Sequence, residues 1–324
     1  MIQQKHLEEI WKELNYSGQS EFEFKRIDSK AIPEIHIGLN SKFNRCLLLE
    51  LPQNHTVDFQ TVVKKNLTLH FFAKSNYIVL ELTDSSFFDL FDDLILSIYS
   101  HIYQLDEVDV YANIFIQIFY KWSEFFEEKE SHKLSLESIK GIWGELFVLK
   151  GLIEESNSFK INEILNSWRG LYDEAHDFVL DEKDIEVKTK DLSHLSVKIS
   201  SEYQLEEELD KSLELWVLSV EIDFIKGKSI STLIEEIKLL VVNKMGDFSI
   251  VLTALLQKNI LMSNIHQYDN YRFLEKEKLI FDCTHKDFPK LTQGNTSKAI
   301  SNIRYKLQLS YLSDYLVSKE SFNE

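Results

Sequence analysis

Hydrophobic and polar residues alternate in short runs through the first part of the chain, a pattern typical of strands with one buried face. Apolar positions at helical spacing precede these runs and predict a helix over residues 3–15. Turn residues such as Asn40-Ser41 and Ser75-Asn76 separate the alternating runs and favour a small antiparallel sheet. The predicted strands are 22–27, 34–39, 46–51, 67–74 and 77–82, and two helices follow at 87–104 and 108–128.

The polar stretch 127–133 (EEKESHK) is the best candidate for a domain boundary, because the pattern changes beyond it. The segment 213–222 is almost wholly apolar, as expected for a strand buried on both faces. Other predicted strands are 176–180, 185–190, 195–200, a hairpin at 271–283 and 303–309; predicted helices are 135–155, 202–211, 231–243 and 248–261. We therefore predict an α+β protein: an N-terminal α+β recognition or interaction domain (1–130), then a domain with a mixed central sheet flanked by helices (131–324).

Composition narrows the class of protein. A content of 44% hydrophobic and 12% aromatic residues is that of a folded chain. The two cysteines show no CxxC spacing, which argues against a disulfide framework or zinc knuckle. Apolar runs reach only about ten residues, half of what a bilayer requires, and the first residues show no signal peptide. These features predict a soluble, cytoplasmic protein without a membrane partner.

Residues 176–190 (HDFVLDEKDIEVKTK) carry the clearest chemistry. Glu186 and Lys188 are two residues apart on a predicted strand and therefore project from one face, while Val187 points to the other. A short turn brings Asp177, on the preceding strand, beside Glu186. Carboxylates bind hard cations such as Mg²⁺ or Mn²⁺, and a bound cation with a nearby lysine suits phosphodiester hydrolysis.

The spacing of an acid and a lysine is common by itself. The same triplet occurs at 23–25, 28–30, 127–129, 181–183 and 236–238. An ordinary surface hairpin with a cross-strand ion pair is therefore the alternative interpretation. Only Glu186–Lys188 has an aspartate on an immediately preceding apolar strand, which favours a site.

Two further residues extend the candidate site. Glu145 lies on the apolar stripe of the predicted helix 135–155, where burial of a carboxylate is costly without a partner. Gly141 and Gly144 beside it lower helix propensity and indicate close approach of a strand or a ligand. A structural contact to Lys or Arg is the alternative for Glu145. Gln204, at the start of the predicted helix 202–211, is either a substrate contact or a solvated first-turn residue.

A locally basic tail stands out in a chain whose net charge is −17. That charge argues against duplex binding by the whole surface. Residues 286–306 carry five basic side chains against one acid, Asp287, and could contact a nucleic-acid backbone; an ordinary solvated loop is equally consistent. The basic residues are Lys286, Lys290, Lys298, Arg304 and Lys306.

The order of these features resembles the restriction-endonuclease-like core. More specifically, GIWGELFVLKGLIE, Trp168, HDF, IEVKT and VKISSEYQLE resemble the bacterial family of PD-(D/E)XK motif proteins, encoded in restriction and anti-phage islands. His176 stands where the motif has proline. The resemblance implies metal binding by Asp177 and Glu186, with the Val187 carbonyl as a third ligand. Lys188 would position the water or the scissile phosphate, Glu145 would hold a water or a second ion, and Gln204 would orient substrate.

The residues and the resemblance together thus imply a Mg²⁺- or Mn²⁺-dependent endonuclease, and the resemblance implies that it cuts DNA in bacterial restriction or anti-phage defence. It has no nucleotide-binding loop of its own, so a helicase, ATPase or methyltransferase is the expected partner. Two alternatives stay open. One is a catalytically inactive nuclease-fold subunit that binds DNA or protein, and the other is an RNA nuclease.

Overall fold

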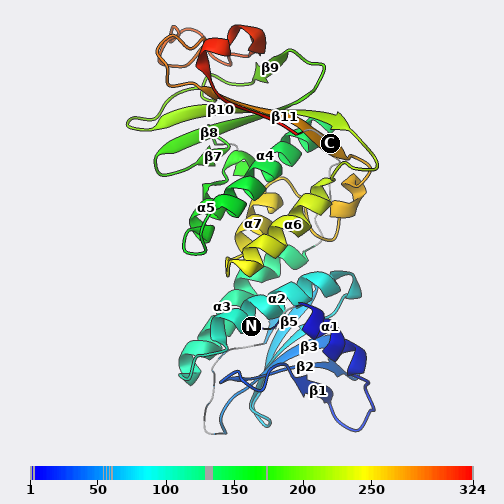
Figure 1. Ribbon diagram of the computed structural model, residues 1–324. Helices are drawn as coiled ribbons and strands as arrows, with labels where there is room; N and C mark the ends of the chain where they lie inside the picture. Colours follow the sequence, from blue (N-terminus) through cyan, green and yellow to red (C-terminus); the bar gives the residue numbers. More distant parts are fainter. Residues whose placement is uncertain are drawn as a thin grey trace. The chain divides into compact units, whose positions relative to one another are not determined.

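The computed structural model describes residues 2, 4–53, 55, 57, 59, 61–127, 134–172 and 174–322. The chain forms two compact units, Met1–Lys129 and Glu130–Glu324, which are described separately (Figure 1). Both units combine helices with sheets, so the predicted α+β class is confirmed. Of the expected boundary stretch, residues 128–133 lie outside the described residues.

The first unit contains a six-stranded antiparallel sheet in the order β1-β2-β3-β6-β5-β4. Five of its strands match the alternating runs of the sequence, while the two-residue β4 was not predicted. Two of the turns place a non-glycine residue at positive φ, at Phe43 and Asn76. The strands are β1 (Phe22–Arg26), β2 (Glu34–Asn40), β3 (Arg45–Glu50), β4 (Val62–Val63), β5 (Leu67–Phe72) and β6 (Tyr77–Leu82).

Three helices cover one face of this sheet, as Figure 1 shows. They are α1 (Gln4–Glu13), α2 (Phe88–Ile102) and α3 (Val108–Ser123). Consecutive residues of the central strands are buried, and Ile37, Leu47 and Leu80 are among those with no exposed surface. Asp84 caps the short 3-10 turn that precedes α2 by accepting a hydrogen bond from the Ser86 amide.

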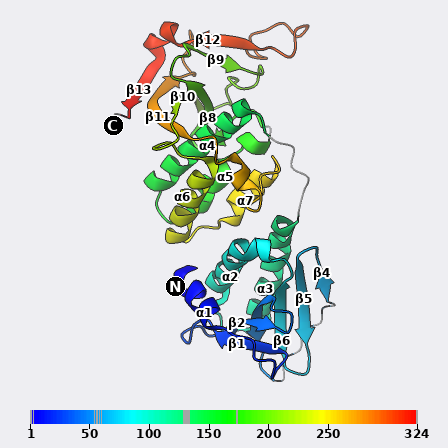
Figure 2. The same cartoon turned by 90° about the vertical axis from the view of Figure 1, so that its right-hand side faces the viewer.

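The second unit is built on a five-stranded mixed sheet in the order β13-β11-β10-β8-β7. The central pair, β8 and β10, is parallel, and every other pair in this sheet is antiparallel. Figure 2 shows a separate two-stranded sheet of β9 and β12 beside it. The strands are β7 (Phe178–Val179), β8 (Lys183–Asp191), β9 (Ser196–Ile199), β10 (Ser212–Ile222), β11 (Phe273–Asp282), β12 (Tyr305–Gln308) and β13 (Leu316–Ser321).

Helices lie on one face of the mixed sheet, and the small sheet covers the other (Figure 1). The helices are α4 (Leu136–Glu155), α5 (Ile161–Ser167), α6 (Ile230–Asn243) and α7 (Ser249–Leu256). Ser135 caps α4 through the Ser138 amide. On the opposite face, Val197, Ile199 and Leu307 pack with Leu215 and Val217 in one apolar cluster. The prediction of a mixed central sheet is thus right, whereas helices flank only one side.

Two predicted elements are wrong, each for a local reason. Residues 202–211 form turns instead of a helix. The Gln204 side-chain oxygen accepts the Ser200 amide and the Ser201 hydroxyl accepts the Tyr203 amide, and such local side-chain to backbone bonds compete with helix formation. Within the predicted hairpin 271–283, residues Phe273–Asp282 form one continuous strand, β11, which pairs with β10 and β13 on its two edges. Strand β13 and helix α5 were missed altogether.

Two of the three glycines of α4, Gly141 and Gly144, offer a matched test of packing. A methyl group at Gly144 would lie 1.8 Å from Oγ1 of Thr189 on β8, whereas Gly141 has nothing within 4 Å. The predicted close approach of a strand therefore holds for Gly144 and not for Gly141. Gly144→Ala should lower the free energy of unfolding by about 1–3 kcal/mol, the usual cost of overpacking. Gly141→Ala should raise it by about 1 kcal/mol. Denaturant unfolding of both variants checks this; equal effects would contradict the packing of α4 on β8.

Candidate active site

Asp177 and Glu186 face each other across two adjacent strands. Asp177 immediately precedes β7, and the register pairs Phe178 with Ile185, so the next pair along is Asp177 with Glu186. The Asp177 carboxylate accepts a hydrogen bond from the Val187 amide over 2.8 Å. This bond fixes one oxygen of Asp177 against β8. The hairpin expected from the sequence thus brings both carboxylates to one place.

Glu186 and Lys188 project from the same face of β8 and form an ion pair. The Glu186 side chain is only 1% exposed, and that of Lys188 is 18% exposed. One Glu186 oxygen contacts the ammonium, while the other, Oε2, is buried without a hydrogen-bond partner. A buried carboxylate oxygen without a partner is energetically costly, so it marks a position suited to a cation or a donor.

Glu145 reaches the same cluster from helix α4. Its Oε2 atom accepts a hydrogen bond from the Trp168 indole over 2.8 Å. Trp168 is 1% exposed and forms a β-bridge with Phe178. The tryptophan therefore ties the helix carboxylate to the strand that begins beside Asp177.

Gly170 lies where the carboxylates of Glu145 and Asp177 meet. A methyl group at this position would be 2.4 Å from Glu145 Oε2 and 2.5 Å from Asp177 Oδ1. The Gly170 amide also donates to the Asp177 carbonyl over 3.1 Å. The absence of a side chain at Gly170 thus leaves the space that these two carboxylate oxygens occupy.

The electrostatics of the cluster are those of crowded, buried acids. Burial, followed by the charge of Asp177, raises the pKa of Glu186 to about 8 and also raises the pKa of Glu145. Burial raises the pKa of Asp177 despite the opposing charge of Lys188. Burial disfavours the charged form of Lys188, but the neighbouring carboxylates outweigh it and raise its pKa. Three acids therefore share one cation, and the site favours further positive charge.

This crowding makes stability depend on pH. The pKa of Glu186 is raised from 4.5 to about 8, so the folded state binds the proton more tightly than the unfolded state. The stability that this bound proton contributes to the folded state is fully present below about pH 4.5 and is lost as pH rises to about 8. In EDTA, wild type should lose stability relative to Glu186→Gln across this window, as followed by urea unfolding at several pH values. A constant difference between the two proteins would contradict a buried, proton-binding Glu186.

The donor set fits a divalent metal ion. Asp177 and Glu186 supply carboxylate oxygens from adjacent strands, one oxygen of Glu186 has no partner, and Gly170 leaves a cradle beside Asp177. Oxygen donors of this kind suit Mg²⁺ or Mn²⁺. Among the described residues, two groups of three potential ligands have their ligand atoms within 4.8 Å of one another, and Glu145, Asp177 and Glu186 are not one of them; the groups are Glu34, His36 and Glu50, and His176, Asp184 and Glu208.

The second of these groups already contains a cation. The Lys211 ammonium lies 3.2 Å from Asp184 and 3.1 Å from Glu208. His176 is 3% exposed and lies 3.5 Å from Asp184. The imidazole is thus a buried side chain packed against Asp184.

The structure does not bring Gln204 to the carboxylates through any contact among the described residues. Its side-chain oxygen accepts a hydrogen bond from the Ser200 amide over 2.7 Å, which closes the turn after β9. The helix expected at this point does not form, so the side chain stabilises its own loop instead. The predicted helix that carried Gln204 is therefore wrong, while its role as a substrate contact stays a prediction.

The five basic residues of the predicted tail have different surroundings. Lys290 is engaged by Glu207 and by the Cys283 carbonyl, so its charge is neutralised within the fold. Lys306 lies on β12 directly opposite Lys198. The other three basic residues, Lys286, Lys298 and Arg304, are exposed.

Trp168 and Gly170 were missed as site residues by the sequence analysis. Both lie in the connection between α5 and β7, where no periodic pattern signals a role. A tryptophan followed two residues later by glycine, just before the candidate aspartate, is the only local signal. Their importance follows from their contacts with Glu145 and Asp177, which sequence spacing does not reveal.

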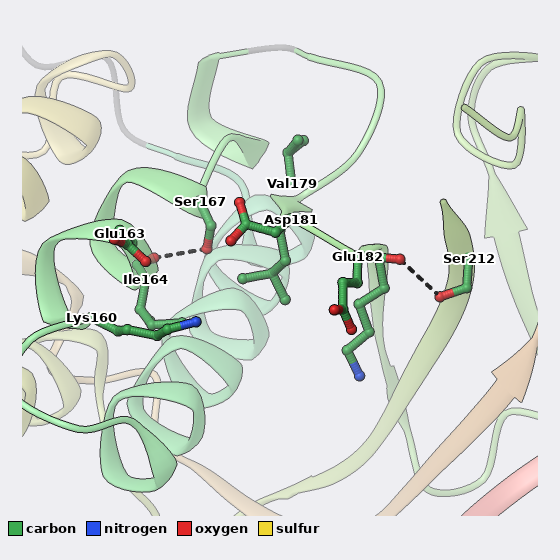
Figure 3. A pocket seen from close by; sticks show the side chains of 10 residues that line it. Lys160, Glu163, Ile164, Ser167, Val179, Asp181, Glu182 and Ser212 are labelled. Carbon is green, nitrogen blue, oxygen red and sulfur yellow. Dashed lines mark hydrogen bonds between the residues drawn. The ribbon is translucent and has the colours of Figure 1, made fainter. Parts of the chain in front are cut away.

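A cavity of about 560 Å³ lies at the far end of the β7–β8 hairpin, between α5 and the turn. Figure 3 shows its acidic lining residues Glu163, Asp181 and Glu182, and a hydrogen bond from Ser212 to the Glu182 carbonyl. None of the candidate site residues lines it. We therefore place the candidate active site at the cluster of Glu145, Asp177 and Glu186 and not at this cavity.

Comparison with known proteins gives one match. A family model described as "Putative PD-(D/E)XK family member" matches residues 7–310, which span parts of both units. No curated protein and no solved structure matches the chain. Among the described residues, no helix is long and apolar enough to cross a membrane.

Proposed function

The chain belongs to the PD-(D/E)XK family whose model spans residues 7–310, and from this premise we propose that it is a metal-dependent DNA endonuclease. Family membership indicates a nuclease-type function. The observation that best supports the finer proposal is the meeting of Asp177, Glu186 and Glu145 around Lys188, with one buried Glu186 oxygen unpartnered. Such a site is built to receive positive charge, as hydrolysis of a phosphodiester requires.

Asp177 and Glu186 would hold the metal, and the Val187 carbonyl would be a third ligand. When bound, Mg²⁺ or Mn²⁺ supplies charge against the phosphate and acidifies water. Lys188 remains protonated because the surrounding carboxylates raise its pKa. Its ammonium is held by Glu186 and is therefore placed to orient the water or to stabilise charge that develops on the phosphate.

Glu145 would act from the opposite side of the cluster. The Trp168 indole fixes one of its oxygens, and burial raises the pKa of its carboxyl group. A carboxylate that resists ionisation becomes a stronger acceptor once positive charge arrives. We propose that Glu145 holds a water or a second ion beside Asp177.

We also propose that the protein works with partners in bacterial restriction or anti-phage defence. With 53 acidic and 36 basic residues, the chain as a whole repels DNA. A helicase, ATPase or methyltransferase would supply the missing affinity or remodelling. We therefore expect weak cleavage by the isolated protein and stronger cleavage with its neighbouring gene products.

The experiment is Mn²⁺-supported cleavage of plasmid, single-stranded DNA and RNA, with and without the neighbouring gene products. The proposal expects DNA cleavage that EDTA abolishes and that neighbouring proteins enhance. Cleavage of RNA alone would replace DNA by RNA as the substrate. Absence of cleavage in every mixture, together with absence of metal binding, would leave a non-catalytic binding subunit.

A further inference from the structure

A groove of about 400 Å³ opens beside the candidate catalytic lysine. It lies between the start of α4, the end of β8, the β8–β9 connection, β9 and β12. Five of the described residues that line the groove are lysines. Glu137 is the only acidic residue among the described lining residues. The five lysines are Lys140, Lys188, Lys190, Lys198 and Lys306. The chain has a net charge of −17, so the charge of this groove is opposite to that of the protein as a whole.

Two of these lysines oppose each other directly. Lys198 on β9 pairs in register with Lys306 on β12, and both are exposed. Like charges at directly opposite positions destabilise an antiparallel pair. The alternate residues Val197, Ile199 and Leu307 are buried in the apolar cluster, so the two ammonium groups project away from it. Neither has an ion pair among the described residues, so the fold leaves their charge available.

A third lysine is buried and also lacks a partner. Lys190 is 8% exposed and follows Lys188 on the same face of β8. It forms no side-chain hydrogen bond or ion pair within the described part of the chain, and burial lowers its pKa. Keeping an unpaired ammonium at such a position costs stability. An anion bound in the groove would offset this cost by pairing with the Lys190 ammonium.

The acids near the groove already have other cationic partners: Glu277, whose charge acts on Lys190, contacts Lys319, and Asp191 and Glu137 contact Lys140. The Lys140 ammonium lies 2.8 Å from Asp191 and 3.2 Å from Glu137. His194, the remaining titratable lining residue, is 3.7 Å from Asp191. The uncompensated positive charge therefore comes from Lys190, Lys198 and Lys306, and Lys188 links it to the carboxylate cluster.

We propose that this lysine groove binds the phosphodiester backbone of a nucleic-acid strand next to the scissile phosphate. The identity of the ligand rests on the proposed nuclease function, whereas the need for an anion rests on the groove alone. Lysines bind backbone phosphates without reading base sequence. The groove would therefore position the strand for Lys188 and would not select a sequence.

The test is fluorescence anisotropy of a labelled single-stranded DNA 20-mer of mixed sequence, with the full chain, in EDTA and low salt. Lys198→Glu/Lys306→Glu should weaken binding at least tenfold. A control with the same charge change, Lys42→Glu/Lys74→Glu, uses exposed lysines of the first unit and should stay near wild type. For Lys198→Ala/Lys306→Ala, the slope of log affinity against log salt should become shallower by about 1.4.

Lys190→Met gives an independent readout, because it removes a buried charge and keeps the volume. Its melting temperature should equal or exceed that of wild type while DNA binding weakens. Equal loss in the groove and control variants, unchanged binding by Lys190→Met, or no binding by wild type would each overturn the proposal. Lysine-dependent binding, together with no metal binding and no cleavage in Mn²⁺ in any mixture with the neighbouring gene products, would instead keep the groove and reject the nuclease function.

Discussion

Lys188→Ala should reduce DNA cleavage by about a thousandfold, the upper end of the range seen when one preorganised electrostatic group is removed. The variant should nevertheless fold. Glu186 already has its pKa raised to about 8, so it can bind a proton when the ammonium is gone. We therefore expect the free energy of unfolding in EDTA to fall by only about 1–2 kcal/mol, since protonation spares most of the cost of an unpaired charge.

Asp177→Ala is the matched change on the other strand. It removes the hydrogen bond from the Val187 amide, worth about 1 kcal/mol, but it also removes one of three crowded acids. The two effects oppose each other, so stability in EDTA should stay close to that of wild type while cleavage is lost. A purely structural ion pair predicts otherwise: losses of about 3–5 kcal/mol when a partner is removed from a buried pair. Losses of that size in both variants, with cleavage retained, would make the hairpin a scaffold.

Gly170→Ala should reduce cleavage by about a hundredfold, as expected when reacting groups are displaced by about 1 Å. The added methyl group would meet oxygens of Glu145 and Asp177 at 2.4 and 2.5 Å, so one carboxylate must move. Gly170 has no positive φ, and alanine therefore fits its backbone. Loss of activity would thus come from the displaced carboxylates.

The control for this substitution is Gly151→Ala, because Gly151 lies on α4 and has nothing within 4 Å. It should leave cleavage unchanged. Circular dichroism and thermal melts would show that Gly170→Ala is folded. Full activity in a folded Gly170→Ala protein would contradict the cradle that we assign to Glu145 and Asp177.

Residues close together in sequence made the centre of the site predictable. Strand alternation alone places Glu186 and Lys188 on one face and Asp177 beside them, because the connecting turn is short. Glu145 was recognisable as a carboxylate on an apolar helical stripe. Its partner Trp168 was not assigned a role, since that hydrogen bond depends on how α4 packs beside β7.

Contacts between distant segments were beyond the sequence pattern. Lys198 and Lys306 meet because β9 pairs with β12, outside the main sheet. Gln204 was predicted at the start of a helix. The structure has a turn there instead, and a turn closed by side-chain hydrogen bonds contains the same residue types as a helix start. The run from Phe273 to Asp282 contains no turn residue and continues as one strand between two partners.

The central claim is that Asp177 and Glu186 bind a catalytic divalent metal, and metal binding can be measured without knowledge of substrate or partner. The most direct measurement is the melting temperature of wild type and Asp177→Ala in EDTA and in rising Mn²⁺. Ligand binding to the folded state alone stabilises it by about 2.7 kcal/mol at a hundred times Kd. We predict a saturable rise for wild type and none for Asp177→Ala. A wild-type melting temperature that does not respond to Mn²⁺, or an equal rise in both proteins, would contradict the account.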